Sequence, residues 1–166
     1  MYLIPLPRKV IEREGLFLIG HNTAIVLDVA LDDNDLETAK LLQQEIKKVI
    51  AITLPIKKVL RSAGDLYENC ICFQYDNIDT RKEAYMLSVR SNKITITACS
   101  SRGFLYGVAT LIQLCKISRA EIGCTDIEDE PSYSNRGYML DVSRGRVPTM
   151  NSLKVLVDRK STRLNS

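Results

Sequence analysis

The stretch EAYMLSVRSNKITITAC, residues 83–99, decides the fold. Apolar and polar side chains alternate along residues 83–90 and again along residues 93–99, which is the period of a β-strand with one buried face. Ser91 and Asn92 form a link short enough to close a hairpin between the two runs. We therefore expect an antiparallel pair of strands at the centre of a sheet.

Shorter β-type runs precede this hairpin. Residues 9–12 and 16–19 are separated by a glutamate and a glycine at 14–15, which predicts a strand, a turn and a strand. Residues 23–28 predict a third strand, and residues 69–75 alternate in the same way as the hairpin. These runs would supply further strands of the same sheet.

An acidic cluster at residues 32–35 precedes the first helical pattern. Asn34, with Glu37 three residues later, predicts a capping pair at the start of this helix, and Pro55 ends the helical region. The apolar residues at helical spacing form one stripe, made of Leu36, Ala39, Leu42, Ile46, Val49 and Ile50. A helix with a single apolar stripe is expected to lie on the sheet.

A second helix is predicted from a cap at Ser100 or Ser101 to about Lys116. Its apolar residues cover most of its circumference, namely Phe104, Leu105, Val108, Leu111, Ile112, Leu114 and Cys115, so we expect burial on two sides. Gly103 and Gly107 lie one turn apart and would let another backbone come close. We expect a partner from outside this domain to pack there.

The first domain is expected to cover residues 1–130. Residues 124–127 predict a last strand, and the acidic residues 128–130 with Pro131 are typical of a linker. Together these elements predict an α+β fold, with a mainly antiparallel sheet and two helices packed on one face.

Residues 131–158 predict the truncated start of a (β/α)8 barrel, beginning with its first strand. The apolar run at residues 136–142 leads into Asp141 and Arg144. Polar residues at the carboxyl end of a buried strand are where such barrels place their chemistry. Asp141 and Arg144 are therefore the candidate substrate-binding residues.

The end of the chain changes character. Leu153, Leu156 and Val157 have the spacing of one helix face and predict the start of the first barrel helix. Residues 159–166, with the sequence RKSTRLNS, have no helical stripe and resemble a translated sequencing adaptor. We expect this last segment to be a foreign or disordered tail.

Charge and composition exclude several classes of function. The 23 basic and 20 acidic side chains are spread along the chain, which argues against a nucleic-acid partner. No window approaches the roughly 18 apolar residues of a membrane span, and the first ten residues lack the pattern of a signal peptide. The five cysteines, an odd number, fit reduced thiols in the cytoplasm. We expect a cytoplasmic protein with no membrane partner.

Other residues that could carry chemistry have plainer interpretations. His21 is the only histidine, lies in a predicted turn and is not expected to be catalytic. Cys70 and Cys72 lack the C-x2-C spacing and the second ligand pair of a zinc site, so they are interpreted as core or surface thiols. The acidic clusters at 32–35 and 128–130 lack the pattern of a calcium loop. We predict no metal site and no cofactor.

Several short motifs follow one another along residues 2 to about 158. They are Leu3-Ile4-Pro5-Leu6-Pro7, Glu83 to Val89, Ile94 to Ala98, Gly103 to Gly107, Thr110 to Leu114, Ile127 to Pro131, Arg136-Gly137 and Leu140 to Arg144. In order and spacing they resemble the glycoside hydrolase family 20 β-N-acetylhexosaminidases. That family carries a small α+β domain ahead of a (β/α)8 barrel, so the resemblance implies the same arrangement here.

The resemblance implies an activity for the full-length protein. The family removes terminal β-linked N-acetylglucosamine or N-acetylgalactosamine from glycans or chitooligosaccharides, and the substrate's own acetamido oxygen attacks the anomeric carbon. An adjacent Asp-Glu pair on a later barrel strand orients the acetamide and protonates the leaving oxygen, and no part of this chain matches that strand. We therefore expect an inactive fragment without catalytic residues, whose small domain packs on its own barrel in the full-length protein.

One residue is carried over from the family by position. Arg144 matches an arginine that hydrogen-bonds the hydroxyls of the terminal sugar, a role that suits the planar fork of donors in a guanidinium group. Asp141 would either contact the substrate or hold Arg144 through a charge-assisted hydrogen bond. Gly145 and Arg146 stand where many members carry a histidine and an aromatic residue. The resemblance therefore does not define the rim of the sugar site.

Two alternatives remain. The chain would otherwise be a stand-alone α+β interaction domain, or the leading domain of another family of sugar hydrolases. A stand-alone domain leaves the apolar strand after residue 131 without a purpose, because its edges would be unpaired. The motif from Asp141 to Arg144 argues against a different hydrolase family.

Overall fold

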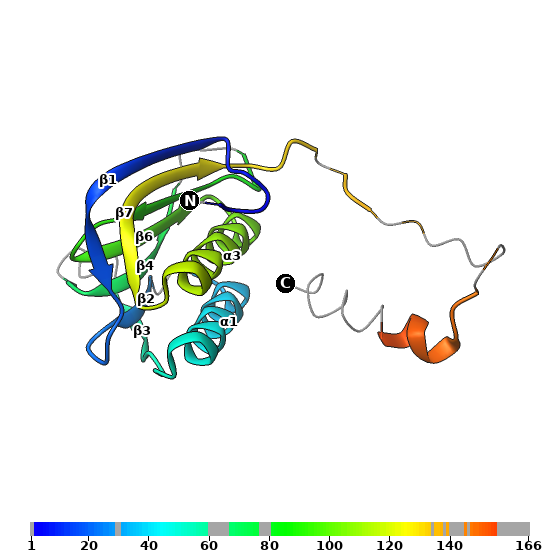
Figure 1. Ribbon diagram of the computed structural model, residues 1–166, viewed down its shortest axis with the longest axis horizontal. Coiled ribbons are helices and arrows are strands. Elements are labelled where there is room, and N and C mark those ends of the chain that lie inside the picture. The colour runs from blue at the N-terminus through cyan, green and yellow to red at the C-terminus, as the bar shows by residue number, and fades with distance from the viewer. Residues whose placement is uncertain are drawn as a thin grey trace. The chain divides into compact units, whose positions relative to one another are not determined.

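The chain divides into two compact units, Met1–Pro131 and Ser132–Ser166. The computed structural model (Figure 1) describes residues 2–28, 31–59, 67–76, 81–133, 135–137, 139, 145 and 147–155. In these ranges no helix combines the length and the apolar character needed to cross a membrane.

The first unit is built on one seven-stranded sheet in the order β1-β7-β5-β6-β4-β2-β3. The strands are β1 (Lys9–Leu18), β2 (Ala24–Asp28), β3 (Ile56–Val59), β4 (Cys70–Tyr75), β5 (Tyr85–Val89), β6 (Lys93–Ala98) and β7 (Glu121–Asp129). Strand β7 is antiparallel to β1 and β5, and β5 is antiparallel to β6. The pairs β6/β4, β4/β2 and β2/β3 are parallel. The sheet is therefore mixed, and the expectation of a mainly antiparallel sheet was wrong.

The parallel half of the sheet follows from its connections. Adjacent parallel strands need a crossover between them, and helix α1 (Asp33–Ile50) supplies it between β2 and β3. Strand β3 was not predicted from the sequence. Lys57 and Lys58 fill its middle, so apolar and polar residues do not alternate along it. Lysines are common on an edge strand, where they discourage pairing with other chains.

The predicted hairpin is confirmed. Strands β5 and β6 pair with Leu87 opposite Ile96 and Val89 opposite Ile94, and all four side chains are fully buried. Strand β6 is the middle strand of the seven. The alternating pattern was decisive because these strands have one face in the core and the other outside it.

Strand β1 is one bent strand rather than two strands joined by a turn. Its pairing with β7 continues on both sides of an irregularity between Glu12 and Leu16. Gly15 lies within this bulge with a φ of 108°, a conformation that glycine adopts without steric cost. Strand β7 is also longer than predicted, because Glu128 and Asp129 belong to the strand rather than to a linker.

Helix α1 (Asp33–Ile50) is capped two residues earlier than predicted. Asp32 accepts a hydrogen bond from the backbone N–H of Asp35, and the Asp35 side chain accepts one from the backbone N–H of Asp32. This reciprocal capping box replaces the predicted pair Asn34 and Glu37. The predicted stripe is confirmed in its central part, where Ala39, Leu42 and Ile46 are buried.

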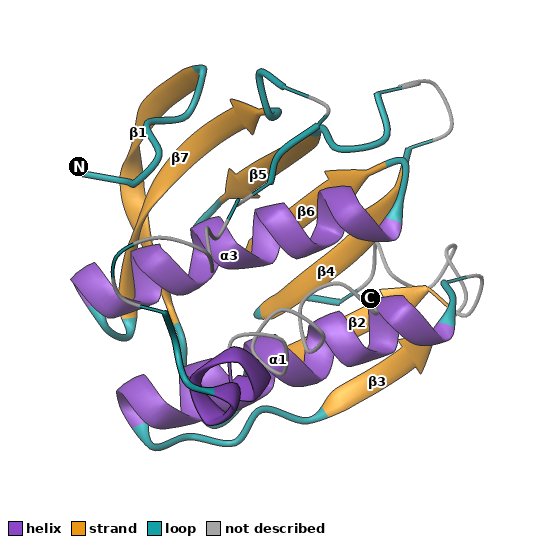
Figure 2. Ribbon diagram, turned by 90° about the vertical axis from the view of Figure 1, so that its right-hand side faces the viewer, coloured by secondary structure: helices purple, strands orange, loops and turns teal. Residues whose placement is uncertain are grey.

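Helix α3 (Ser101–Ser118) lies beside α1 on the same face of the sheet (Figure 2). Its N-cap is Ser100, one of the two predicted serines, and Ser101 Oγ donates to the Asp32 carboxylate at 3.4 Å. At the other end, Arg119 donates to the backbone oxygen of Val49 at 3.1 Å. The two helices therefore run in the same direction, with their N-termini together.

The glycines of α3 allow a close approach to the chain's own sheet. A Cβ at Gly103 would lie 2.4 Å from the backbone oxygen of Ala84, and one at Gly107 would lie 2.6 Å from Ile96. The expectation of an outside partner at these glycines was wrong. Helix α3 instead lies unusually close to β5 and β6, which buries Val108 on its inner side.

The core fills the space between the sheet and the two helices. Its largest fully buried side chains are Phe17, Ile25, Leu27, Leu42, Ile46, Leu54, Ile71, Leu87, Ile94, Ile96, Phe104 and Leu111. The rings of Phe73 and Phe104 lie 5.4 Å apart between centroids and join β4 to α3. A second, smaller cluster contains Ala24, Val26, Cys70 and Cys72. These four alternate with the core residues of β2 and β4, so they lie on the other face of the sheet.

The second unit contains a helical stretch at residues 150–155. Thr149 caps it, because Thr149 Oγ1 accepts from the backbone N–H of Ser152 at 3.2 Å. This is a helical stretch where the first barrel helix was predicted, and its assignment to a barrel stays a prediction; Leu156 and Val157 lie outside the described residues. Most of the predicted first barrel strand and the whole predicted tail, residues 159–166, also lie outside them.

Candidate functional site

The predicted substrate-binding residues, Asp141 and Arg144, lie outside the described residues. His21 is exposed in a turn after β1, as its sequence context predicts. Among the described residues, no three His, Cys, Asp or Glu side chains come together as metal ligands.

The largest polar cluster lies on the open face of the sheet, opposite the helices, and is centred on Asp126. Arg13 Nε donates to Asp126 Oδ2 at 2.5 Å, and Arg90 donates to both carboxylate oxygens at 2.8 and 3.0 Å. Ser88 Oγ donates to Oδ1 at 2.9 Å. The cluster ties β1, β5 and β7 together because Ser88 and Asp126 are register partners on neighbouring strands.

This carboxylate is held in its charged form. The hydrogen bond from Arg90 keeps the pKa of Asp126 well below its usual range, with Arg13 and Ser88 adding to the effect and burial opposing it. The cluster borders an open depression of about 290 Å³ that is also lined by Lys9, Met86 and Glu128. A carboxylate that accepts from two arginines and a serine is a structural tie, and its low pKa makes it a poor general base.

We expect Asp126→Asn to lower the free energy of unfolding by about 1 kcal/mol near pH 7, because solvent screens the partly exposed arginines. A depressed folded pKa contributes its full stability above the unfolded pKa of aspartate, about 3.9, and loses it as the pH falls through the folded pKa. Urea unfolding of both proteins should therefore differ near pH 7, and the two should converge progressively as the pH falls below about 4. The control Glu121→Gln, on an exposed residue of the same strand, should show no such convergence.

Cys70 and Cys72 form a close pair that the sequence did not reveal. Both are buried, in agreement with their interpretation as ordinary core thiols, but their Sγ atoms lie only 3.4 Å apart. They are alternate residues of β4 and therefore point to the same face of the sheet. The spacing that argued against zinc also brings two sulfurs together.

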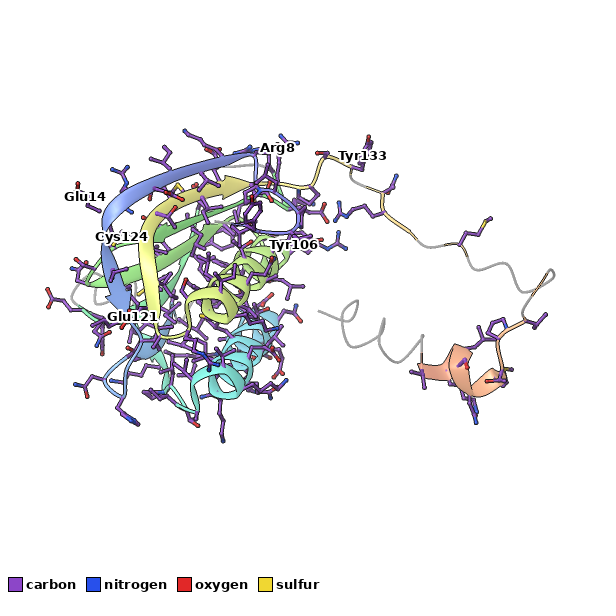
Figure 3. All side chains as sticks on the ribbon, in the orientation of Figure 1. Arg8, Glu14, Tyr106, Glu121, Cys124 and Tyr133 are labelled. Atoms are coloured by element: carbon purple, nitrogen blue, oxygen red, sulfur yellow. The ribbon has the colours of Figure 1, made fainter. Side chains whose placement is uncertain are left out.

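The segment before β1 is fixed to α3 through Gln113. The backbone N–H of Ile4 donates to Gln113 Oε1 at 3.0 Å, and Gln113 Nε2 donates to the backbone oxygen of Ile4 at 3.0 Å. Leu3 is buried in the core, which anchors the segment further. Arg8, labelled in Figure 3, forms an ion pair with Glu130 at 2.5 Å and so ties this segment to the end of β7.

The contacts of Gln113 and Arg8 hold the segment before β1 as a clamp, and they leave an apolar surface outside the core. Tyr2, Ile4 and Leu6 are 93%, 81% and 78% exposed, although the backbone that carries them is held in place. Ala109 and Ile117 lie on the same side of α3 as Gln113, four residues before and after it, and are also exposed. We call these five residues, Tyr2, Ile4, Leu6, Ala109 and Ile117, the clamp surface. Sequence patterns missed it because the role of Gln113 depends on a contact 109 residues away.

Comparison with known proteins gives a consistent result. The model of the family described as "Glycosyl hydrolase family 20, domain 2" matches residues 1–130. A curated protein named β-hexosaminidase, from Porphyromonas gingivalis, is 28% identical over 155 residues. That alignment covers 86% of this chain and 19% of the relative, so the chain spans about a fifth of the length of that protein.

Solved structures of similar fold point the same way. An exo-β-N-acetylglucosaminidase from Vibrio harveyi, in complex with N-acetylglucosamine, has 26% identity and a TM-score of 0.68, covering 95% of this chain and 23% of that one. The N-acetyl-β-hexosaminidase of Streptomyces plicatus has 25% identity and a TM-score of 0.70, covering 92% of this chain and 30% of that one. The described chain is thus similar to a minor part of proteins that are three to five times longer.

Proposed function

Because this chain belongs to glycosyl hydrolase family 20, we propose that it is the leading part of a β-N-acetylhexosaminidase acting on terminal, non-reducing, β-linked N-acetylglucosamine or N-acetylgalactosamine. The observation that carries the proposal is the match of residues 1–130 to domain 2 of that family. The relative from Vibrio harveyi, solved with N-acetylglucosamine, supports the same class of ligand.

We propose that the chemistry follows a substrate-assisted, retaining route. The acetamido oxygen of the bound sugar attacks the anomeric carbon, and an acidic side chain protonates the leaving oxygen. The Asp-Glu pair that the family resemblance assigns to these roles has no counterpart in this sequence. The 166 residues would therefore form only part of the substrate site, and they would not turn substrate over.

Within this chain, the proposal gives Arg144 the role of binding the hydroxyls of the terminal sugar. A guanidinium group offers several donors in a fixed plane, which suits a row of neighbouring hydroxyls. Asp141 then holds Arg144 or contacts the sugar itself, and a charge-assisted hydrogen bond serves either role. Both assignments rest on the family resemblance of residues 140–144.

We propose that the clamp surface docks on the catalytic barrel of the same protein. Ile4 and Leu6 are almost fully exposed on a backbone that Gln113 and Arg8 fix in place, so the cost of ordering this surface is already met within the small domain. An apolar surface held rigid in water is typical of an interface. The similar proteins are three to five times as long as this chain, which supports a covering partner from the additional chain.

The function is tested with the longer protein encoded by the uninterrupted reading frame. It should hydrolyse a chromogenic β-N-acetylglucosaminide and leave the matching β-glucoside intact, because only the first substrate carries the attacking acetamido oxygen. The 166-residue chain, assayed at the same concentration, should release no chromophore. Turnover by the 166-residue chain, or cleavage of the glucoside at a similar rate, would show that the proposed chemistry is wrong.

The docking proposal has a separate test in Ile117→Asp. In the 166-residue chain Ile117 is 54% exposed, so the change should alter the free energy of unfolding by no more than about 0.5 kcal/mol. In the longer protein it should destabilise by about 2 kcal/mol, because a charge would be placed in an apolar interface. Met86→Asp, at an exposed site on the open face of the sheet, is the matched control and should act equally in both chains. Equal effects of Ile117→Asp in both chains would contradict docking.

A further inference from the structure

Strand β1 forms one edge of the described sheet, and β3 forms the other (Figure 2). An edge strand presents backbone N–H and C=O groups to which another strand can bond. The β3 edge carries Lys57 and Lys58, which discourage such pairing. The charged residues of β1 lie within or before its bulge, and residues 16–18 after the bulge, Leu-Phe-Leu, carry no charge. One edge of the sheet is therefore protected by charge, and the last part of the other edge is not.

The backbone groups of Leu16 and Leu18 point away from the rest of the sheet. The backbone N–H of Ile19 donates to the backbone oxygen of Ala120 at 2.9 Å, so the backbone of Ile19 faces the chain of β7. The direction of hydrogen bonding alternates along an antiparallel strand, so the backbone of Phe17 also faces β7. The N–H and C=O groups of Leu16 and Leu18 then face outward. In the described part of the chain, no strand pairs with this edge.

The side chains of Leu16 and Leu18 are uncovered as well. They flank Phe17, which is buried in the core, so they lie on the open face of the sheet, where they are 52% and 59% exposed. Leu16 lies opposite Gly123 on β7, which has no side chain to cover it. Leu18 lies opposite Glu121, which is itself exposed. The two leucines therefore form an apolar patch directly beside the unpaired edge.

We propose that two copies of this chain associate through β1, as antiparallel partners across a two-fold axis at Phe17. In that register Leu16 lies opposite the partner's Leu18, and Leu18 lies opposite the partner's Leu16. Each pair exchanges two backbone hydrogen bonds, because both of its residues carry outward N–H and C=O groups. The same pairs bring four exposed leucine side chains together on the open face. The segment is thus complementary to itself in backbone and in side chains, as a two-fold contact requires.

The length of this contact is limited at both ends. The bulge between Glu12 and Leu16 bends β1 on one side. On the other side the backbone N–H of Gly20 already donates to Thr23 Oγ1 at 3.0 Å. The contact is then centred on residues 16–18 and is smaller than the about 1,600 Å² that stable complexes typically bury. We expect a reversible dimer whose population rises with protein concentration.

Sedimentation equilibrium of the 166-residue chain measures this association. The average mass should rise with concentration from one chain toward two and no further, because a two-fold contact closes on itself. Leu16→Lys should weaken dimerisation by about tenfold or more, because it removes an apolar pair and adds two like charges near the axis. The matched control is Met86→Lys, on the same face but on an inner strand and 47% exposed, which should leave dimerisation unchanged.

Amide hydrogen exchange locates the contact without any variant. The N–H groups of Leu16 and Leu18 should become protected as the protein concentration rises. The N–H of Phe17 faces β7 within a single chain, so it should be protected at every concentration. This alternation of response along three consecutive residues is the signature of a strand added at the edge.

Three results would overturn the proposal. The first is a chain that stays monomeric up to about 1 mM, or a dimer in which the Leu16 and Leu18 amides exchange as in the monomer. The second is a dimer that Ile117→Asp disrupts, because the clamp surface would then be the contact. The third is protection of both amides in a longer protein that remains monomeric, which would assign the edge to that protein's own chain. Sugar hydrolysis enters none of these measurements.

Discussion

Gly103→Val should lower the free energy of unfolding of the 166-residue chain by about 3 kcal/mol, among the largest effects of any single change in α3. Even a Cβ atom at this position would come within 2.4 Å of the Ala84 backbone oxygen and 2.8 Å of the Ala98 side chain. The obstructing atom belongs to the backbone next to a central strand, so a side chain cannot simply turn aside. Helix α3 would have to lift from the sheet.

The matched control places the same new side chain on the exposed side of the same helix. Ala109→Val should cost no more than about 0.7 kcal/mol, which is the helix-propensity term for valine. Urea unfolding measures both proteins, and an unchanged slope would show that the shift in midpoint reports stability. If the two variants lose equal stability, the close packing of α3 on β5 and β6 is not what Gly103 provides.

Arg144→Ala in the longer protein should lower kcat/KM by about 30- to 1000-fold, which corresponds to roughly 2–4 kcal/mol of transition-state stabilisation. The reason is that hydrogen bonds to the sugar hydroxyls strengthen as the ring is distorted toward the shape of the transition state. The loss should therefore fall on kcat as well as on kcat/KM. Steady-state kinetics with a chromogenic β-N-acetylglucosaminide measures both constants.

Arg144→Lys should recover only part of this loss, since one ammonium cannot reproduce the fork of a guanidinium group. Arg102→Ala removes an arginine from α3 that is 68% exposed and should leave kcat/KM unchanged within about twofold. An enzyme indifferent to Arg144→Ala would show that the sugar-binding role has been given to the wrong residue.

Local patterns predicted the elements whose sequence matches their environment. The hairpin of β5 and β6 was predictable because each strand has one face in the core, so burial imposes strict alternation. The Ser100 cap was predictable because a serine stands directly before a long apolar helical pattern. In α1 several polar residues compete for the cap, and Asp32 takes it because Asp32 and Asp35 exchange hydrogen bonds between side chain and backbone.

Non-local arrangements were not predictable from those patterns. The parallel pairing of β4 with β2 and β6 joins segments that are far apart in sequence, and no single segment encodes its neighbour. The same reason hid the partners of Gly103, because glycine indicates that something comes close but not what it is. Of the candidate site, the family resemblance supplied Asp141 and Arg144, and their placement stays a prediction. The thiol pair emerged only from the geometry of β4.

The position of β7 between β1 and β5 has a consequence for biosynthesis. Lys9 pairs with Glu128, so the first strand of this domain waits for its last strand before it finds a partner. Until then the nascent chain carries two open strand edges, one on β1 and one on β5, and such edges recruit other chains. The time between the synthesis of β1 and that of β7 is therefore the interval in which this domain is most exposed to pairing with other chains.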